Sequence, residues 1–511
     1  MEAISTRSTS IFRIVSWRHF AAALLVGFAL RLFFIAHFTA YAGDSKFYQE
    51  LARNWLDHGV YGRYYLGRMI PVDMRMPGYP AFLAAIYSLF GRADKTIMLV
   101  QVFVDLTTCV LVALIAARLA PARTKTIIAT AALWIAALCP FTANYTAVVL
   151  TETLSAFLTT LGLFVFICIL LDPSMDRPAR SFDARTLLRA AGWFLVAGAV
   201  VGAGTLVRPE MPLLLVAMVL ALCIRWRRRV DWSKLAFASS WMVAGMFLLL
   251  TPWALRNART LEQVEFLAPR YATMQNDFAP RGFFQWTQTW MEQFEDAYFV
   301  SWNLTRAPIL IDTIPASAFD SESERDRVAS LLARYNSNLR MTPELDQEFA
   351  QVAHERTARH PLRTYLTIPA ARAIAIWFTP RIELLPYSGK IWPLEEKWRA
   401  NSTDFDVTVG FGLLNFVYVG LACVGAWSCR KHPVLALLGA FILTRTALLT
   451  QLQTVEPRYV VVCFPALMAL GAQACGGIAT LAHSLAARGK AATLFALRGA
   501  NSKPRLPADL T

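Results

Sequence analysis

Charged side chains are scarce in this sequence. Asp, Glu, Lys and Arg make up 17% of its 511 residues, whereas hydrophobic residues make up 56%. A soluble domain usually carries about 25% charged residues. Long apolar runs such as 149–171 and 235–250 replace the missing charge, and they approach or exceed the roughly 18–20 residues that cross a bilayer core. The composition therefore argues against a soluble enzyme and predicts a polytopic membrane protein.

Several common site patterns are also missing. The eight cysteines all lie in or beside apolar runs, without a C-x-x-C pair, so no disulfide framework is expected in the polar loops. The seven histidines are scattered and show no zinc-binding spacing. Neither a dinucleotide-binding nor a P-loop fingerprint occurs, so no nucleotide-sugar site is expected. The first apolar run, 20–40, lacks a convincing cleavage site, and we interpret it as a retained span.

The net charge of +15 follows the pattern of membrane topology. Basic residues form short clusters between apolar runs, and they do not gather in one soluble segment as nucleic-acid binding would require. Assigning alternate loops to alternate sides puts nearly every short basic cluster on one side, which must be the cytoplasm. We predict about ten helical spans, within a range of 8–13, at about 20–40, 95–117, 127–147, 149–171, 188–206, 210–224, 234–254, 407–428, 433–450 and 459–480.

These spans divide the chain into four regions. Residues 1–254 form an N-terminal membrane core whose first loop, 41–94, is external, and residues 255–405 form an external, mostly helical region. Residues 406–482 carry the C-terminal spans, and 483–511 form a basic cytoplasmic tail. Both termini are then cytoplasmic, and the external face is the periplasmic face of the inner membrane if the source is bacterial. The apolar segments 77–90 and 364–378 agree best with the alternation of loops between the two sides if neither segment crosses the membrane. Both could lie along the interface or re-enter the bilayer.

The long external region contains signals of ordered structure. Ser321-x-x-Glu324 is a capping box before a helix to about Tyr335. Thr342-Pro343-Glu344 supplies an N-cap, a Pro at the first position and an early acid for the next helix. Eight aromatic side chains lie between 283 and 302. They fit either an aromatic belt at the membrane interface or a platform for a sugar or lipid chain.

Two acids stand at the external ends of spans. Asp44 follows the first span, where a carboxylate can accept a proton from a hydroxyl nucleophile; alternatively it caps the next helix. Glu152 begins an apolar run, where an ionisable group is a functional candidate; alternatively it favours the positive end of its own helix. If the two converge, they could orient an acceptor or hold a divalent cation.

Three arginines stand at external span ends, against the positive-inside trend. Arg75, Arg256 and Arg458 carry guanidinium groups suited to phosphate recognition. Any one of them fits a snorkelling anchor, but three beside a candidate base favour an anionic lipid head group. Arg31, inside the first span, either snorkels or faces the bundle interior.

Five short motifs occur together in a particular order. An acid after the first span is followed by R-x-P-G-Y-P, T-E-T-L, T-P-W-x-x-R-N and E-P-R-Y. This order, over about residues 20–475, resembles bacterial membrane glycosyltransferases of the C-type superfold, among them the protein O-mannosyltransferase, aminoarabinose transferase and lipopolysaccharide galacturonosyltransferase groups. The resemblance implies an all-α polytopic bundle and a polyprenyl-phosphate sugar donor.

The resemblance also implies roles for individual residues. Asp44 would be the catalytic or acceptor-orienting carboxylate, and Glu152 the second carboxylate. Ser45 follows Asp44 where the protein O-mannosyltransferases carry a second acid, which weakens the case for a protein acceptor. The substrate-binding residues that we expect are Arg75, Tyr79, Arg208, Arg256, Asn257, Glu456, Arg458 and Tyr459.

The sequence thus favours a membrane transferase with Asp44 as base. The predicted reaction is inverting transfer of one sugar, hexose or pentose, to a hydroxyl of a lipid, glycan or protein at the external face. The sequence identifies no definite cofactor, and a divalent cation on Asp44 and Glu152 stays open. The alternative is a transporter or flippase of a lipid-linked sugar, whose sites usually lie near the bilayer midplane.

Overall fold

The computed structural model describes residues 11–40, 42–176, 183–226, 231–271 and 278–477. The predicted tail, 483–511, lies outside these residues. The described chain is mostly helical, and its single sheet is a two-stranded hairpin. The predicted all-α polytopic architecture is confirmed.

The helices of the membrane bundle coincide with the predicted spans. They are α2 (Trp17–His37), α5 (Asp94–Leu119), α6 (Lys125–Ala137), α8 (Glu152–Leu170), α9 (Ala184–Val207), α10 (Pro212–Arg225), α11 (Trp232–Thr260), α18 (Ser402–Ser428), α19 (Pro433–Leu449) and a last stretch, Pro457–Gly477. By length and composition, seven of them can each cross a membrane, and α6 makes an eighth if it counts together with the bent segment after it. The apolar helices α10 and α19 are shorter. A four-residue helix, α1 (Ile11–Ile14), precedes α2.

The close packing of α9 against α11 depends on glycine. A Cβ on Gly198 would collide with the carbonyl oxygen of Met242, and one on Gly245 would collide with that of Leu195. Small residues let backbones approach closely where lipid supplies no hydrophobic drive for helix association. The glycines therefore fix the spacing of α9 and α11.

One span is broken beside the future site. After α6, the chain bends by 45° at Pro140 into α7 (Pro140–Ala143) and a 3₁₀ turn (Asn144–Ala147). Pro lacks the N–H that would continue the helix, and carbonyls freed within a membrane need partners. Gln101 of α5 donates to the carbonyls of Thr146 at 3.2 Å and Val148 at 2.8 Å. These bonds set the place where α8 begins.

Arg31 stabilises the same break from inside the bundle. Its guanidinium is fully buried, donates to the Ala137 carbonyl at 2.9 Å and pairs with Asp105 of α5 at 2.5 Å. Of the two placements considered for Arg31, the structure has the interior one. The ion pair links α2, α5 and the end of α6.

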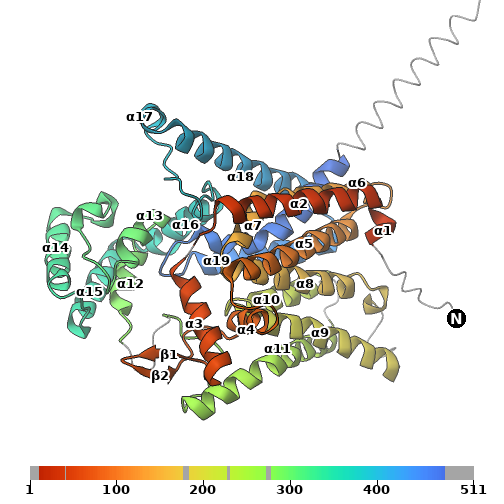
Figure 1. Ribbon diagram of the computed structural model, residues 1–511, viewed down its shortest axis with the longest axis horizontal. Helices are drawn as coiled ribbons and strands as arrows, with labels where there is room; N and C mark the ends of the chain where they lie inside the picture. The colour runs from red at the N-terminus through yellow and green to blue at the C-terminus, as the bar shows by residue number, and fades with distance from the viewer. Residues whose placement is uncertain (1–10, 41, 177–182, 227–230, 272–277, 478–511) are drawn as a thin grey trace, which may run out of the picture.

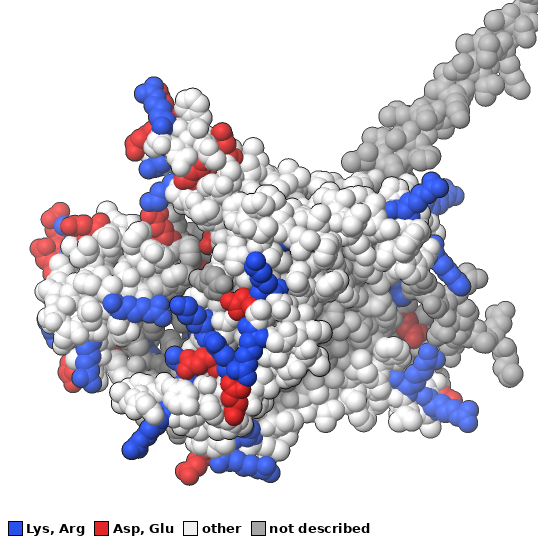
Figure 2. Space-filling model, viewed as in Figure 1, with Lys and Arg blue, Asp and Glu red and all other residues white. Residues whose placement is uncertain are grey.

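The remaining elements lie at one end of the bundle (Figure 1). From the first loop come α3 (Gly43–His58), the antiparallel hairpin of β1 (Gly62–Tyr65) and β2 (Arg68–Pro71), and α4 (Gly78–Phe90). From the long loop come α12 (Arg281–Gln288), α13 (Phe294–Asp296), α14 (Glu322–Asn336), α15 (Pro343–Arg359), α16 (Ile368–Trp377) and α17 (Leu394–Ala400). In Figure 2, blue side chains predominate at the opposite end, and the broad side between is mostly white.

The helices of the long loop have a core of their own. Ser321 and Thr342 cap α14 and α15 as predicted, accepting from the N–H groups of Glu324 at 3.2 Å and Leu345 at 3.3 Å. Phe283, Trp286 and Trp290 are buried in this core. For these three residues both earlier interpretations, belt and platform, are wrong, because their rings pack inside the protein. Tyr298, Phe299 and Trp302 remain exposed.

Candidate active site

Asp44 lies in the first turn of α3, just beyond α2. Its Oδ1 accepts from Arg75 at 3.0 Å and its Oδ2 from Arg458 at 3.3 Å. The residue before the helix is Ala42, which makes no side-chain capping bond. The helix-cap interpretation of Asp44 is therefore wrong. The carboxylate stays 29% exposed, so it is accessible to a substrate.

Glu152 is the first residue of α8 and is almost completely buried. Its Oε1 accepts from Arg208 at 3.1 Å and lies 4.0 Å from Nε of Arg458. Its Oε2 is buried without a hydrogen-bond partner, which is unusual for a carboxylate oxygen and calls for a ligand or water. The helix start also favours the charge, so the structural interpretation of Glu152 fits its position at the start of α8, and its functional role stays a prediction.

The two acids belong to a larger charge cluster. Arg458 also pairs with Glu456 at 2.5 Å, and Arg208 pairs with Glu210 at 2.7 Å. The ring of Tyr459 lies between the two guanidinium groups, 4.7 Å from that of Arg208 and 5.2 Å from that of Arg458. Arg445 also pairs with Glu210. The cluster therefore contains four carboxylates and four guanidinium groups, those of Asp44, Glu152, Glu210 and Glu456 and those of Arg75, Arg208, Arg445 and Arg458.

The cluster controls ionisation at its accessible edge. Burial alone would raise the pKa of Asp44, but the charges of Arg75 and Arg458 more than offset it and hold the pKa below its ordinary value. Burial, followed by the Asp44 charge, raises the pKa of Tyr48 to about 12. At neutral pH the site therefore presents an ionised carboxylate beside a neutral phenol.

Other predicted residues support the site from outside. Tyr79 is buried, donates to Gln101 at 2.8 Å and packs edge-on against Tyr48, with ring centroids 5.2 Å apart. Arg256 donates to the carbonyls of Tyr61 at 2.6 Å and Val72 at 2.9 Å. No contact between described residues joins Arg256 to Arg458.

Arg256 and Asn257 instead stabilise the loop between α2 and α5. The Tyr61 hydroxyl donates to the Arg75 carbonyl at 2.9 Å, so Arg256 reaches the cluster only through Tyr61. Asn257 accepts from Arg256 at 2.9 Å and donates to the Glu265 carbonyl at 3.1 Å. A shared phosphate cavity for Arg256 and Arg458 stays a prediction.

Sequence reasoning missed several members of the cluster. Arg445 is a lone arginine inside the apolar run of α19, and intramembrane charge is itself a functional signal. Glu210 follows Arg208 in the tight turn between α9 and α10, a local pairing that the sequence displays. Glu383 accepts from Tyr145 at 2.8 Å, and no signal in the sequence connects these two residues.

A cation held by Asp44 and Glu152 would have to displace Arg458, which lies within reach of both. Among the described residues, no group of three or more His, Cys, Asp or Glu side chains is arranged to hold a metal ion. The open carboxylate oxygens are Oε2 of Glu152 and the exposed edge of Asp44.

No protein-family model and no curated protein matches the sequence. Similar solved structures include an Archaeoglobus fulgidus oligosaccharyltransferase with Zn and sulfate, at a TM-score of 0.47 and 13% identity over 94% of this chain and 51% of that chain. The archaeal oligosaccharyltransferase AglB from Archaeoglobus fulgidus, in complex with an inhibitory peptide and a dolichol-phosphate, gives a TM-score of 0.47 and 11% identity over 98% of this chain and 53% of that chain. ArnT from Cupriavidus metallidurans bound to undecaprenyl phosphate gives 0.35 and 15% over 90% and 78%. The chain spans about half the length of the archaeal chains, and at these scores the similarity assigns no activity.

Proposed function

We propose that the protein is a membrane glycosyltransferase that moves one sugar from a polyprenyl phosphate to an acceptor hydroxyl at the external membrane face. The observation that carries the proposal is Asp44, an ionised and partly exposed carboxylate between two guanidinium groups. It stands next to the external helices, where a lipid-borne donor and a water-borne acceptor can meet.

The proposed step is a single displacement. The acceptor oxygen attacks the anomeric carbon, its proton passes to the Asp44 carboxylate, and the bond from that carbon to the phosphate oxygen breaks. The electron pair of that bond leaves with the phosphate, so the anomeric configuration inverts. A base placed within hydrogen-bond distance typically contributes about 10²–10⁴-fold, and phosphate needs no general acid to leave.

The charge balance of the cluster suits this step. Arg75 and Arg458 hold the Asp44 carboxylate before reaction. When Asp44 takes the acceptor proton it loses its charge, at the moment when the leaving phosphate gains one. The guanidinium groups can then turn from the carboxylate to the phosphate, which stabilises the developing charge.

Glu152 has a different task in this proposal. Its Oε2 has no partner, and a buried acceptor left unpaired costs about 1–3 kcal/mol. A sugar or acceptor hydroxyl that donates to Oε2 would remove this cost, so Glu152 would orient a substrate and need not exchange a proton.

A transporter or flippase of a lipid-linked sugar is the second candidate. The broken span at Pro140 favours it, because discontinuous helices commonly line transport sites. A flippase leaves the bond between sugar and phosphate intact, whereas the proposed transferase breaks it.

The decisive experiment uses purified protein in nanodiscs with a panel of polyprenyl-phosphate sugars labelled in the sugar. Envelope lipid and glycan fractions serve as acceptors. Transfer of label to an acceptor supports the transferase, and intact donor moved across a bilayer supports the flippase. If correctly folded protein neither transfers the label nor moves intact donor with any member of the panel, both candidates are ruled out.

A further inference from the structure

The segment that leads into α16 exposes apolar side chains along one side. The exposed positions recur every fourth residue at Leu362, Leu366, Ala370, Ile374 and Phe378, and Leu362 and Ile374 are 73% and 62% exposed. The opposite side, with Ile368, Arg372 and Ile376, is buried. A helix in water shows polar side chains on its outer face. Here the pattern is reversed, so the outer face has an apolar partner.

Contacts with neighbouring helices show how far α16 descends. Arg372 donates to the carbonyls of Thr450 and Leu452 just past the end of α19, at 3.0 and 2.9 Å. Trp377 donates to Thr446, one turn inside α19, at 3.0 Å. Each step along α16 therefore meets a deeper level of the bundle.

The end of α16 reaches the middle of α18. Asn415 donates to the Trp377 carbonyl at 2.7 Å, and it lies about 20 Å along α18 from its first residue, Ser402. Arg381 is buried there and donates to Asn415 at 3.1 Å and to the Pro457 carbonyl at 3.1 Å. The chain thus ends its descent at Arg381 within the bundle.

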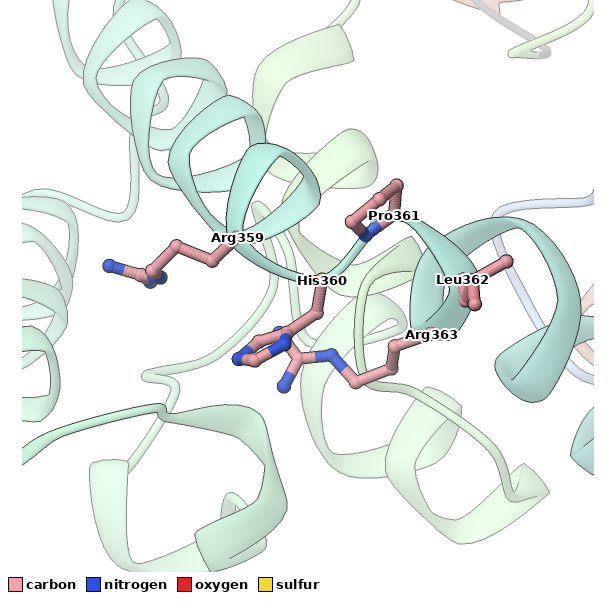
Figure 3. A pocket seen from close by; sticks show the side chains of 5 residues that line it. All are labelled: Arg359, His360, Pro361, Leu362 and Arg363. Atoms are coloured by element: carbon pink, nitrogen blue, oxygen red, sulfur yellow. The ribbon is translucent and has the colours of Figure 1, made fainter.

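A basic cavity of about 370 Å³ marks the other end of the segment. It is lined by Arg359, His360, Pro361, Leu362 and Arg363 at the junction of α15 and α16 (Figure 3). In the figure the side chains of His360 and Arg363 overlap in the view, and Leu362 points away from them. Arg363 pairs with Asp320 at 2.6 Å, while its Nε is buried without a partner.

The ion-pair network beside the cavity, which includes the buried Arg356, has an excess of positive charge, and no carboxylate lines the cavity itself. Arg356, Arg359 and Arg363 face the carboxylates of Asp320 and Glu324, three cations against two anions. Arg363 precedes Arg372 by about 13 Å of helix. Because Arg372 lies beside the end of α19, the cavity lies on the outer side of that level, the side on which lipid head groups stand.

We propose that residues 362–378 form a re-entrant helix in the external leaflet, and that the basic cavity at its start binds the phosphate of an anionic phospholipid. The adjoining apolar side chains Leu362 and Leu366 favour a lipid phosphate over a free one, since they would contact its acyl chains. The inference rests on the proposed membrane topology and does not depend on the proposed catalytic activity.

Photo-crosslinking tests the insertion. Benzoylphenylalanine replaces Ile374 in one variant and His354, an exposed residue of α15, in the control. In nanodiscs that contain phosphatidylglycerol, the Ile374 variant should gain the mass of one phospholipid on illumination, and the His354 variant should not. No lipid adduct at position 374, or equal adducts at both positions, would overturn the re-entrant helix.

Native mass spectrometry tests the head-group site by counting retained phosphatidylglycerol. Arg363→Gln should reduce retention about fivefold, the effect expected of one basic residue near an anionic surface. Arg327→Gln is the matched control, because Arg327 pairs with Glu355 on the same external helices and should retain wild-type binding. Leu366→Asn leaves every ion pair intact and should also lower retention. Equal retention by wild type and Arg363→Gln, or competition by inorganic phosphate with no effect of Leu366→Asn, would contradict the lipid site.

Discussion

The guanidinium group of Arg458 donates a hydrogen bond to the carboxylate of Asp44 at 3.3 Å, although the two residues lie 414 positions apart in the chain. Asp44 follows the first span and Arg458 opens the last one. The candidate site therefore forms only when the two ends of the membrane bundle meet, and its charge depends on both.

The pH dependence of turnover should reveal how far the charge of Arg75 lowers the pKa of Asp44. In the wild type the lowered pKa keeps Asp44 ionised, so turnover should fall only below the ordinary range for Asp. Arg75→Gln removes a cation that opposes the effect of burial, so the pKa of Asp44 should rise and the acid limb should move to higher pH. The measurement is the ratio of kcat/KM at about pH 5 to that at about pH 7.

Arg63→Gln is the matched control for this profile. Arg63 contacts the Phe47 ring at 4.4 Å, as Arg75 does at 5.2 Å, but it pairs with Glu50 and not with Asp44. Its profile should stay that of the wild type. An unchanged acid limb in Arg75→Gln would show that Asp44 does not limit the reaction at low pH.

Glu152→Gln should lower kcat by about 10–100-fold, the loss of a hydrogen bond to a charged group. This is less than the loss expected for Asp44→Asn if Glu152 only orients a substrate. EDTA should then leave turnover unchanged. A loss equal to that of Asp44→Asn, together with inactivation by EDTA, would instead indicate that the two acids share a cation.

The buried pair of Arg31 and Asp105 should be a stability determinant. Arg31→Leu leaves Asp105 charged and the Ala137 carbonyl unpaired, and removal of one partner from a buried pair typically costs about 3–5 kcal/mol. The double variant Arg31→Met/Asp105→Leu should recover most of that loss. Thermal unfolding in detergent measures both, with Arg18→Gln, an exposed residue at the start of α2, as control. Wild-type stability of Arg31→Leu would refute this role.

Reporter fusions test the topology. A reporter that fluoresces only in the cytoplasm should be bright when fused after Lys431, between α18 and α19, and dark when inserted at Ser321 at the start of α14. The one-sided distribution of short basic loops requires this result. Fluorescence from the Ser321 fusion would reverse the proposed membrane orientation.

The sequence predicted the helical segments well because an apolar run of sufficient length has few alternatives in a membrane. The hairpin of β1 and β2 escaped prediction. Its strands have four residues each, and its turn places Leu66 and Gly67 at positive φ, 49° and 79°. The usual hairpin signal at such a turn is Asn-Gly or Asp-Gly, which this sequence lacks.

The site was predictable only in part. Asp44, Glu152 and Arg458 stand at span ends, where unexpected charge is visible in the sequence. The partners of Arg256 were not visible, because its bonds to the Tyr61 and Val72 carbonyls depend on how the unpredicted hairpin folds back onto α11. Likewise, the meeting of Arg445 with Glu210 at 3.1 Å depends on the rotation of α19 within the bundle, which hydropathy does not specify.

Turnover of Asp44→Asn tests the central claim most directly. Asn keeps the size of the side chain and removes its charge, so the protein should fold while sugar transfer from the polyprenyl phosphate falls by about 10²–10⁴-fold. The matched control is Asp57→Asn, because Asp57 also lies on α3 and also pairs with an arginine, Arg92; it should keep wild-type turnover. Wild-type turnover by Asp44→Asn, at equal amounts of folded protein in the same nanodiscs, would contradict the assignment of Asp44 as the base.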